Sequence, residues 1–185
     1  MRVRLIVLLA ASSLLGQQTQ VKLDPTITKV NFTVGDVLHT VHGTFQLTQG
    51  DLWFDPTSCK AGGMLVVNGA SGNSGSRARD NRMNKNILQS EIYPEISFTP
   101  DHIDGHVNLS GHSEFKLHGM FTIHGATHEL TMNVKADIHG NRVSAIADFR
   151  VPYVQWGLKN PSTLFLRVSD TVPIEITAVG EIKSS

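Results

Sequence analysis

The sequence has little cysteine, no net charge and no long apolar run. Its 185 residues include one cysteine, Cys59, which excludes an internal disulfide framework and a zinc cluster built from thiolates. Lys plus Arg number 16 and Asp plus Glu number 16, so the formal net charge is zero, and this balance predicts no nucleic-acid partner. Hydrophobic residues make up 40% of a chain whose length suits one domain. An apolar core must therefore hold the protein together.

Motifs of the common enzyme classes are also missing. The chain has no HExxH zinc motif, no GxSxG nucleophile motif and no glycine-rich phosphate loop after a strand. We therefore predict no catalytic residues, no resident metal and no cofactor.

The first 18 residues have the order of a secretory signal peptide. Arg2 and Arg4 precede an almost unbroken apolar run over residues 5–15, and small or polar residues follow to position 20. The run is shorter than the roughly 20 apolar residues that span a bilayer, which makes an uncleaved anchor the weaker alternative. We expect cleavage near residue 18, a periplasmic or secreted protein without a stable membrane anchor, and a buried, unreactive Cys59.

Alternation of apolar and polar residues dominates the rest of the chain. A period of two buries one face of a β-strand. Such runs occupy residues 30–34, 41–47, 96–98, 115–117, 121–123, 130–136, 143–151 and 172–178. No strand–helix–strand alternation is visible, so the predicted sheet is antiparallel and built of hairpins.

Glycine-containing segments mark the predicted turns. They are Gly50–Asp51, Asp104–Gly105, Ser110–Gly111, His124–Gly125 and His139–Asn141. Residues 68–76, rich in Gly, Ser and Asn, indicate a loop, and Pro173 indicates a strand start or a sheet edge. Met83 and Ile87 are four residues apart, which predicts a short helix near residues 77–88 with Ser74 or Ser76 as its N-cap.

About eight strands in one domain must either close or form a sandwich to protect their edges. One inward face per strand, a single helix and the lack of a disulfide favour a barrel with a capped end. An eight-stranded barrel can hold one small ligand. The sequence leaves a homodimer through an edge strand open.

Two clusters of polar residues support alternative functions. His118, His124 and His128 would form a metal site if they converged, although exposed histidines are the simpler interpretation because no usual ligand spacing accompanies them. The helical segment carries an excess of positive charge, which indicates either a solvated face or a contact for an anionic head group at a cavity mouth. The candidate head-group residues are Arg77, Arg79 and Arg82.

Four blocks of sequence, in order, carry a family resemblance. They are Leu23–Pro25 with Val30–Val34 and Thr40–Phe45; Arg79–Asp80 and Met83 with Glu91–Phe98; Phe121–Thr127 with Leu130–Met132; and Phe149–Gly157 with Val172, Ile174 and Ile176. The set covers nearly the whole mature chain and resembles the YceI-like family of exported, lipocalin-like polyisoprenoid-binding proteins. This resemblance implies an all-β fold, an extended eight-stranded antiparallel lipocalin-like β-barrel with one short helix, as a single domain over residues 21–183. It also implies a long apolar tunnel for a lipid tail and no catalysis.

We therefore predict non-enzymatic binding, transport or sequestration of an isoprenoid lipid, either a polyprenyl chain or a quinone. Each buried CH₂ group contributes about 0.8 kcal/mol, so a lipid tail can bind without polar contacts. The predicted lining comprises Phe32, Val34, Val41, Phe45, Met83, Ile87, Phe98, Phe115, Phe121, Phe149 and Trp156. The alternatives are a histidine-based metal or stress-response binding protein on the same barrel and, less favoured, a small lipid-acting enzyme. Such an enzyme would need Glu114 or Asp148 to face inward, against its strand parity.

Overall fold

The computed structural model describes residues 18–35, 40–163 and 167–184. The predicted signal peptide lies outside these ranges, apart from Gln18. Within them, no helix has both the length and the apolar character needed to cross a membrane.

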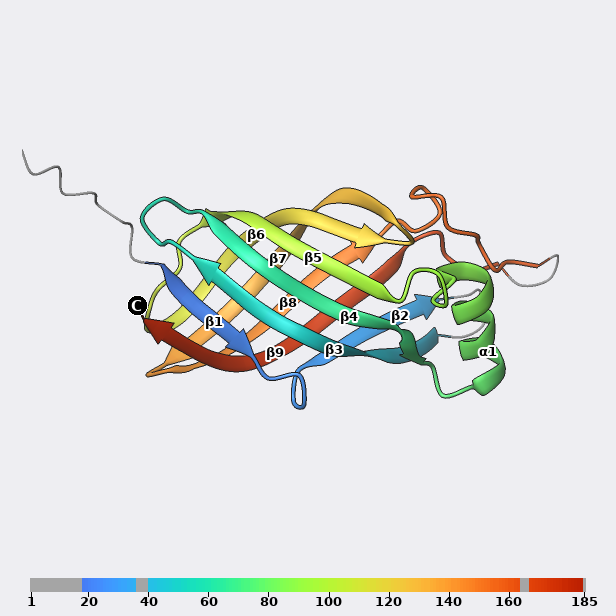
Figure 1. Cartoon of the computed structure of the whole chain (residues 1–185), viewed down its shortest axis with the longest axis horizontal. Helices are drawn as coiled ribbons and strands as arrows, with labels where there is room; N and C mark the ends of the chain where they lie inside the picture. The colour runs from blue at the N-terminus through green and yellow to red at the C-terminus, as the bar shows by residue number, and fades with distance from the viewer. Residues whose placement is uncertain (1–17, 36–39, 164–166, 185) are drawn as a thin grey trace, which may run out of the picture.

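Within the described ranges, nine strand segments form one antiparallel sheet that closes on itself (Figure 1). The segments are β1 (Thr19–Leu23), β2 (Lys29–Gly35), β3 (Thr40–Phe54), β4 (Ala61–Asn73), β5 (Glu95–Gly105), β6 (Gly111–Ile123), β7 (Ala126–His139), β8 (Arg142–Val151) and β9 (Val172–Ser184). β1 and β2 both pair with β3 and with β9, so together they occupy one position in the barrel. The pairing of β3 with β4 completes the closure. The predicted eight-stranded antiparallel barrel is confirmed.

A short turn interrupts the first barrel strand between β1 and β2. The Asp24 carboxylate accepts hydrogen bonds from the Thr26 backbone N–H at 2.8 Å and from its hydroxyl at 2.6 Å. The Asp24 N–H donates to the Val179 carbonyl of β9 at 2.8 Å, and the Thr28 hydroxyl donates to the same carbonyl at 3.3 Å. These bonds keep both halves of the strand attached to β9 across the break.

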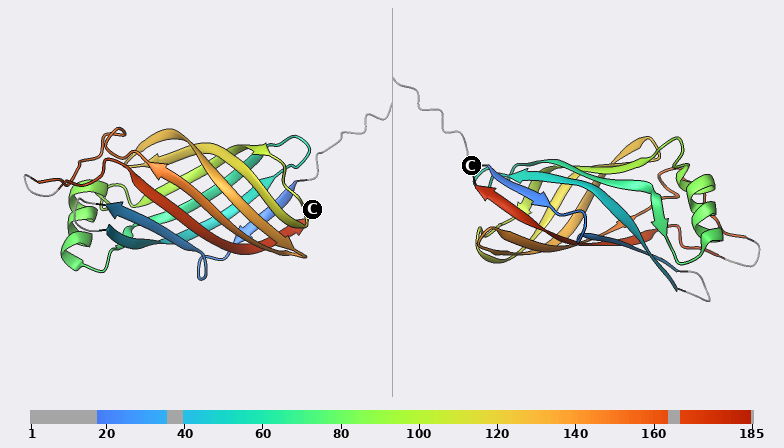
Figure 2. Two further views of the ribbon diagram at one scale, coloured as in Figure 1. Left: turned by 180° about the vertical axis from the view of Figure 1, so that it is seen from behind. Right: turned by 60° about the horizontal axis from the view of Figure 1, so that its bottom comes forward.

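The predicted helix is present as two joined segments. An α-helix, α1 (Arg77–Arg82), begins after Ser76, and a π-helical turn, η1 (Met83–Leu88), continues it. Gln89 ends the turn in the left-handed conformation, and its N–H donates to the Asn84 carbonyl five residues earlier. The helix covers one end of the barrel, while the C-terminus lies at the other end (Figures 1 and 2).

Several local predictions were wrong. Gly50–Asp51 is not a turn but lies inside β3, where a Cβ on Gly50 would come within 2.6 Å of Leu23. β4 continues to Asn73 through most of the predicted loop. The alternating runs around Phe115 and Phe121 belong to the single strand β6.

Two further expectations concern single residues. Cys59 is half-buried rather than buried, because it occupies the turn between β3 and β4 in a left-handed conformation with φ of 58°. Pro173 is the second residue of β9, as expected for a strand start. It does not mark an edge, because β9 is paired on both sides, with β8 and with β2.

Candidate functional site

An apolar cavity of about 160 Å³ lies in the barrel beneath the helix. Strand side chains form its wall, and Met83, Ile87 and Leu88 from η1 close it on one side. Tyr153 and Leu158, in the connection between β8 and β9, also contribute to this end. For comparison, an engineered apolar cavity of about 150 Å³ stays dry and binds benzene. The cavity therefore has room for a small hydrocarbon group.

A second apolar cavity of about 120 Å³ lies toward the other end of the barrel. Its lining includes Val21 of β1, Phe54 of β3 and Ile182 of β9. Leu65, Met132 and Ile176 line both cavities. Met132 is the largest fully buried side chain among the described residues, with 1% of its surface exposed. These three side chains form the partition between the two cavities.

Most of the predicted lining residues are part of a cavity wall. The first cavity is lined by Phe32, Val34, Phe45, Met83, Ile87, Phe98, Phe121 and Phe149. Phe115 lines the second cavity instead. Val41, which is paired with Val34, and Trp156 are not among the described lining residues. Trp156 packs against Phe121, with ring centroids 5.6 Å apart.

Sequence reasoning missed the partition and part of the cap. Met132 belongs to the alternating run over residues 130–136, so the pattern predicted that its side chain points inward. Its role depends on where it falls along the barrel axis, which alternation does not report. Leu88, Tyr153 and Leu158 had no strand periodicity to place them, because they lie in the helix and in a connection.

The Tyr153 hydroxyl, at the capped end of the barrel, already has a hydrogen-bond partner within the protein. The buried Tyr153 side chain lines the first cavity, but its hydroxyl donates to the Ser169 carbonyl at 2.9 Å. Burial, with a smaller effect from the Asp170 carboxylate, raises the pKa of Tyr153 to about 12. Tyr153 therefore stays neutral and holds the connection between β8 and β9 in place.

The candidate head-group arginines are exposed and lie outside the cavity lining. Arg79 donates to the Ser74 hydroxyl at 2.9 Å and to the Ser74 carbonyl at 2.8 Å. Arg82 donates to the Pro161 carbonyl at 3.0 Å. These bonds connect the helix to the residue that follows β4 and to the connection between β8 and β9. Arg77 is exposed at the first position of α1.

Two buried side-chain atoms of the described residues lack a hydrogen-bond partner, the Oδ1 atom of Asn84 and the Nε2 atom of His128, and His128 is the one on a barrel strand. His128, on β7, stacks on Trp156 with ring centroids 4.3 Å apart and planes only 3° from parallel. Its Nε2 atom is buried and has no hydrogen-bond partner among the described residues. Leaving such a group unpaired costs about 1–3 kcal/mol. A ligand atom that bonds to Nε2 would recover part of this cost.

The three histidines of the metal hypothesis do not converge. The alternation of β6 directs the His118 side chain outward. His128 pairs with the inward-facing Phe121 and therefore lies on the opposite face of the sheet from His118. His124 lies in the turn between β6 and β7, where its Nε2 contacts the Gln89 Oε1 at 3.0 Å. The convergence that this alternative required is therefore not met among the described residues.

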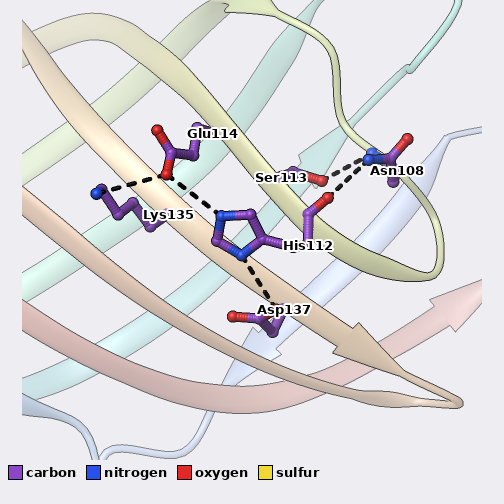
Figure 3. A network of polar contacts seen from close by, with 6 residues as sticks. All are labelled: Asn108, His112, Ser113, Glu114, Lys135 and Asp137. Carbon is purple, nitrogen blue, oxygen red and sulfur yellow. Dashed lines mark hydrogen bonds and ion pairs between the residues drawn. The ribbon is translucent and has the colours of Figure 1, made fainter.

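The two candidate carboxylates for catalysis also face outward, as their parity predicts. Asp148 accepts a hydrogen bond from Asn133 at 3.1 Å. Glu114 contacts Lys135 at 3.4 Å and His112 at 3.4 Å in an exposed network on β6 and β7 (Figure 3). Asp137 contacts the other ring nitrogen of His112 at 3.1 Å. Neither candidate lines an apolar cavity.

Comparisons with solved structures find the same fold. BcnA from Burkholderia cenocepacia matches with a TM-score of 0.71 and 17% identity, over 85% of this chain and 98% of its own. A polyisoprenoid binding domain from Saccharophagus degradans, implicated in plant cell wall breakdown, matches with a TM-score of 0.67 and 16% identity, over 88% and 98%. The YceI protein of Campylobacter jejuni matches with a TM-score of 0.57 and 17% identity, over 76% and 81%.

Comparison with curated protein sequences finds no match. The family model of the YceI-like domain, in contrast, matches residues 21–180, from β1 into β9. This match includes all four blocks that carried the resemblance. The chain therefore belongs to the YceI-like family.

Proposed function

We propose that this protein binds an isoprenoid lipid without catalysing a reaction, and that it stores or carries the lipid in the periplasm or outside the cell. The observation that carries the proposal is the apolar cavity of about 160 Å³ inside the helix-capped end of the barrel. The solved polyisoprenoid binding domain from Saccharophagus degradans, which has the same fold, supports the choice of ligand class.

The proposed driving force is burial of the tail. An isoprene unit has five carbons, and at about 0.8 kcal/mol per buried CH₂-sized group it contributes about 4 kcal/mol before the costs of association. The first cavity matches one benzene-sized group in volume. A tail of several units therefore has to enter the second cavity as well, past the partition formed by Leu65, Met132 and Ile176.

The helix is the proposed entrance. Among its residues only Leu88 is buried and only Met83 and Ile87 are partly buried against the core, so three apolar side chains hold the helix against the barrel. Segments with few buried contacts open at low free-energy cost. Outward movement of Met83, Ile87 and Leu88 would expose the first cavity to an incoming tail.

Polar contacts to the head group are proposed at this same end. His128 offers a buried ring nitrogen beside the Trp156 ring. Arg77, Arg79 and Arg82 offer positive charge on the exposed helix. A quinone carbonyl or a prenyl alcohol could bond to His128, whereas a phosphorylated head group would favour the arginines.

A cavity-filling variant tests the proposal. Val67 is half-buried and lines the first cavity, so Val67→Phe puts a ring into the space reserved for the tail. Displacing one isoprene unit should weaken binding of a prenylquinone by more than about tenfold, measured by tryptophan fluorescence titration. The control is Ile146→Phe, because Ile146 is 47% exposed on the barrel exterior and should leave binding unchanged. Equal affinity of Val67→Phe and the wild type would refute the proposal.

A charged variant provides a second test. Phe149 lines the first cavity and is buried, so a folded Phe149→Arg protein should not take up the prenylquinone, because an arginine occupies the space of the tail. Circular dichroism establishes whether this variant folds. Unchanged uptake by a folded Phe149→Arg protein would show that the lipid binds elsewhere.

A further inference from the structure

A cluster of potential metal ligands lies on the outer wall of the barrel, where β5 and β6 run side by side (Figure 1). Asp101, His102 and His118 each offer one ligand atom, and these atoms lie within 4.8 Å of one another. Among the residues that the structure describes, this is the one group of three or more His, Cys, Asp or Glu side chains that meets that condition.

A β-bulge creates the cluster. In a regular strand, Asp101 and His102 would point to opposite faces. The register between β5 and β6 shifts between Pro100 and His102, and both Asp101 and His102 are exposed on the outside. His102 pairs directly with His118, which brings the second imidazole beside the first.

The side chains already converge on one carboxylate oxygen. The Oδ1 atom of Asp101 lies 2.6 Å from the Nδ1 atom of His102 and 2.8 Å from the Nδ1 atom of His118. The two imidazole rings stack with centroids 4.6 Å apart. Within the described ranges, no lysine or arginine forms an ion pair with Asp101, so its charge is directed at the two histidines.

We propose that Asp101, His102 and His118 bind a divalent transition-metal ion through two imidazole nitrogens and one carboxylate oxygen. Imidazole and carboxylate together suit Zn²⁺ and its neighbours rather than Ca²⁺ or Mg²⁺, which take oxygen ligands. Zinc bonds of about 2.0–2.2 Å in a tetrahedron place ligand atoms about 3.3 Å apart. The present separations from the carboxylate are shorter than this, so small side-chain rotations at an exposed surface would open the site. Water would complete the coordination.

Binding of the ion would replace the two hydrogen bonds that now join the imidazoles to Asp101. Coordination by Nδ1 requires that each imidazole has lost its proton there, so binding exchanges two Nδ1–H hydrogen bonds to Asp101 for two metal–nitrogen bonds. The three ligand atoms are therefore already directed at one point on the barrel surface.

The test is a titration of the protein, purified without a histidine tag, with Zn²⁺ in chelator-free buffer. We expect a single-site isotherm in calorimetry, with movement of the imidazole NMR signals of His102 and His118. Loss of an outer partner of a metal ligand alone costs about 10–100-fold in affinity, so His118→Gln and Asp101→Asn should each weaken binding at least tenfold. Having two ligand variants keeps the test valid if one fails to fold, which circular dichroism reveals.

The matched control is His112→Gln on the same strand. His112 also lies between two carboxylates, but Glu114 contacts its Nε2 and Asp137 contacts its Nδ1, so one ion cannot bind a single ring nitrogen together with both carboxylates. This variant should bind Zn²⁺ like the wild type. Equal affinity of a folded His118→Gln or Asp101→Asn protein, or no zinc binding by the wild type, would overturn the proposal. Neither result bears on the lipid cavity.

Discussion

Met132 is the residue that we expect to limit the length of the proposed lipid site. It is 1% exposed and lines both apolar cavities. Shortening it to alanine should merge the cavities, at a cost of about 2–5 kcal/mol in the free energy of unfolding, as for other buried Met→Ala changes.

The Met132→Ala variant should also bind longer tails relative to shorter ones than the wild type does. Denaturant unfolding measures the first effect, and competition between prenylquinones of different length measures the second. Met120→Ala is the control, because Met120 is 38% exposed on the outside of β6 and should change neither quantity appreciably. An unaltered length preference in a folded Met132→Ala protein would show that the partition does not limit the site.

A substitution at His128 tests the proposed head-group contact separately from the proposed burial of the tail. Phenylalanine at this position keeps an aromatic ring against Trp156 and removes the unpaired buried nitrogen. We expect His128→Phe to be more stable by about 1 kcal/mol. Its affinity for a prenylquinone should fall, while its affinity for a hydrocarbon of the same length should stay unchanged. A parallel fall in both affinities would mean that His128 shapes the cavity and does not contact the head group.

The pair of strands β6 and β7 carries a surface network of titratable side chains, His112, Glu114, Lys135 and Asp137 (Figure 3). Hydrogen bonds to Glu114 and then to Asp137 raise the pKa of His112 above its ordinary value of 6.5. Hydrogen bonding to His112 and the charge of Lys135 lower the pKa of Glu114, so this carboxylate stays ionised in weak acid. A raised histidine pKa stabilises the fold below the ordinary pKa, and this contribution disappears as pH rises through the raised value.

The melting temperature of the wild type should therefore exceed that of His112→Gln at about pH 5.5, where the imidazole is charged. The difference should vanish at about pH 8.5. Thermal melts of both proteins at the two pH values measure it. The effect should be small, because every member of the network is largely exposed. A difference in melting temperature that grows with pH would contradict the raised pKa of His112.

At the level of elements, alternation predicted most strands but not their irregularities. The strand β4 has buried neighbours in sequence, Leu65–Val66, and a stretch of Gly and Ser, so it lacks a simple period of two. The predicted alternating runs omitted this strand but included two runs, 115–117 and 121–123, that both belong to β6, so their number still came to about eight. The bulge between Pro100 and His102 has no signature in residue pattern, because the register shift depends on the partner strand. The cluster of Asp101, His102 and His118 could therefore not be predicted from spacing.

For the whole molecule, closure of the barrel joins the candidate lining into one interior. Phe32 and Phe149 are far apart in sequence and come from β2 and β8, yet they line the same cavity because β9 lies between these strands. The alternation within each strand predicted that both side chains point inward. Closure of the barrel brings the two inward faces together. The sequence could not report how the interior divides into two cavities, because that depends on side-chain packing around Met132.

The measurement that tests the central claim most directly is organic extraction of the mature protein, purified without detergent, followed by mass spectrometry of the extract. Wild type and Val67→Phe, whose substitution fills the first cavity, should be processed in parallel. The account predicts a stoichiometric isoprenoid in the wild-type extract and a depleted one from the folded variant. Equal amounts from both proteins, or none from the wild type even after incubation with excess prenylquinone, would contradict it.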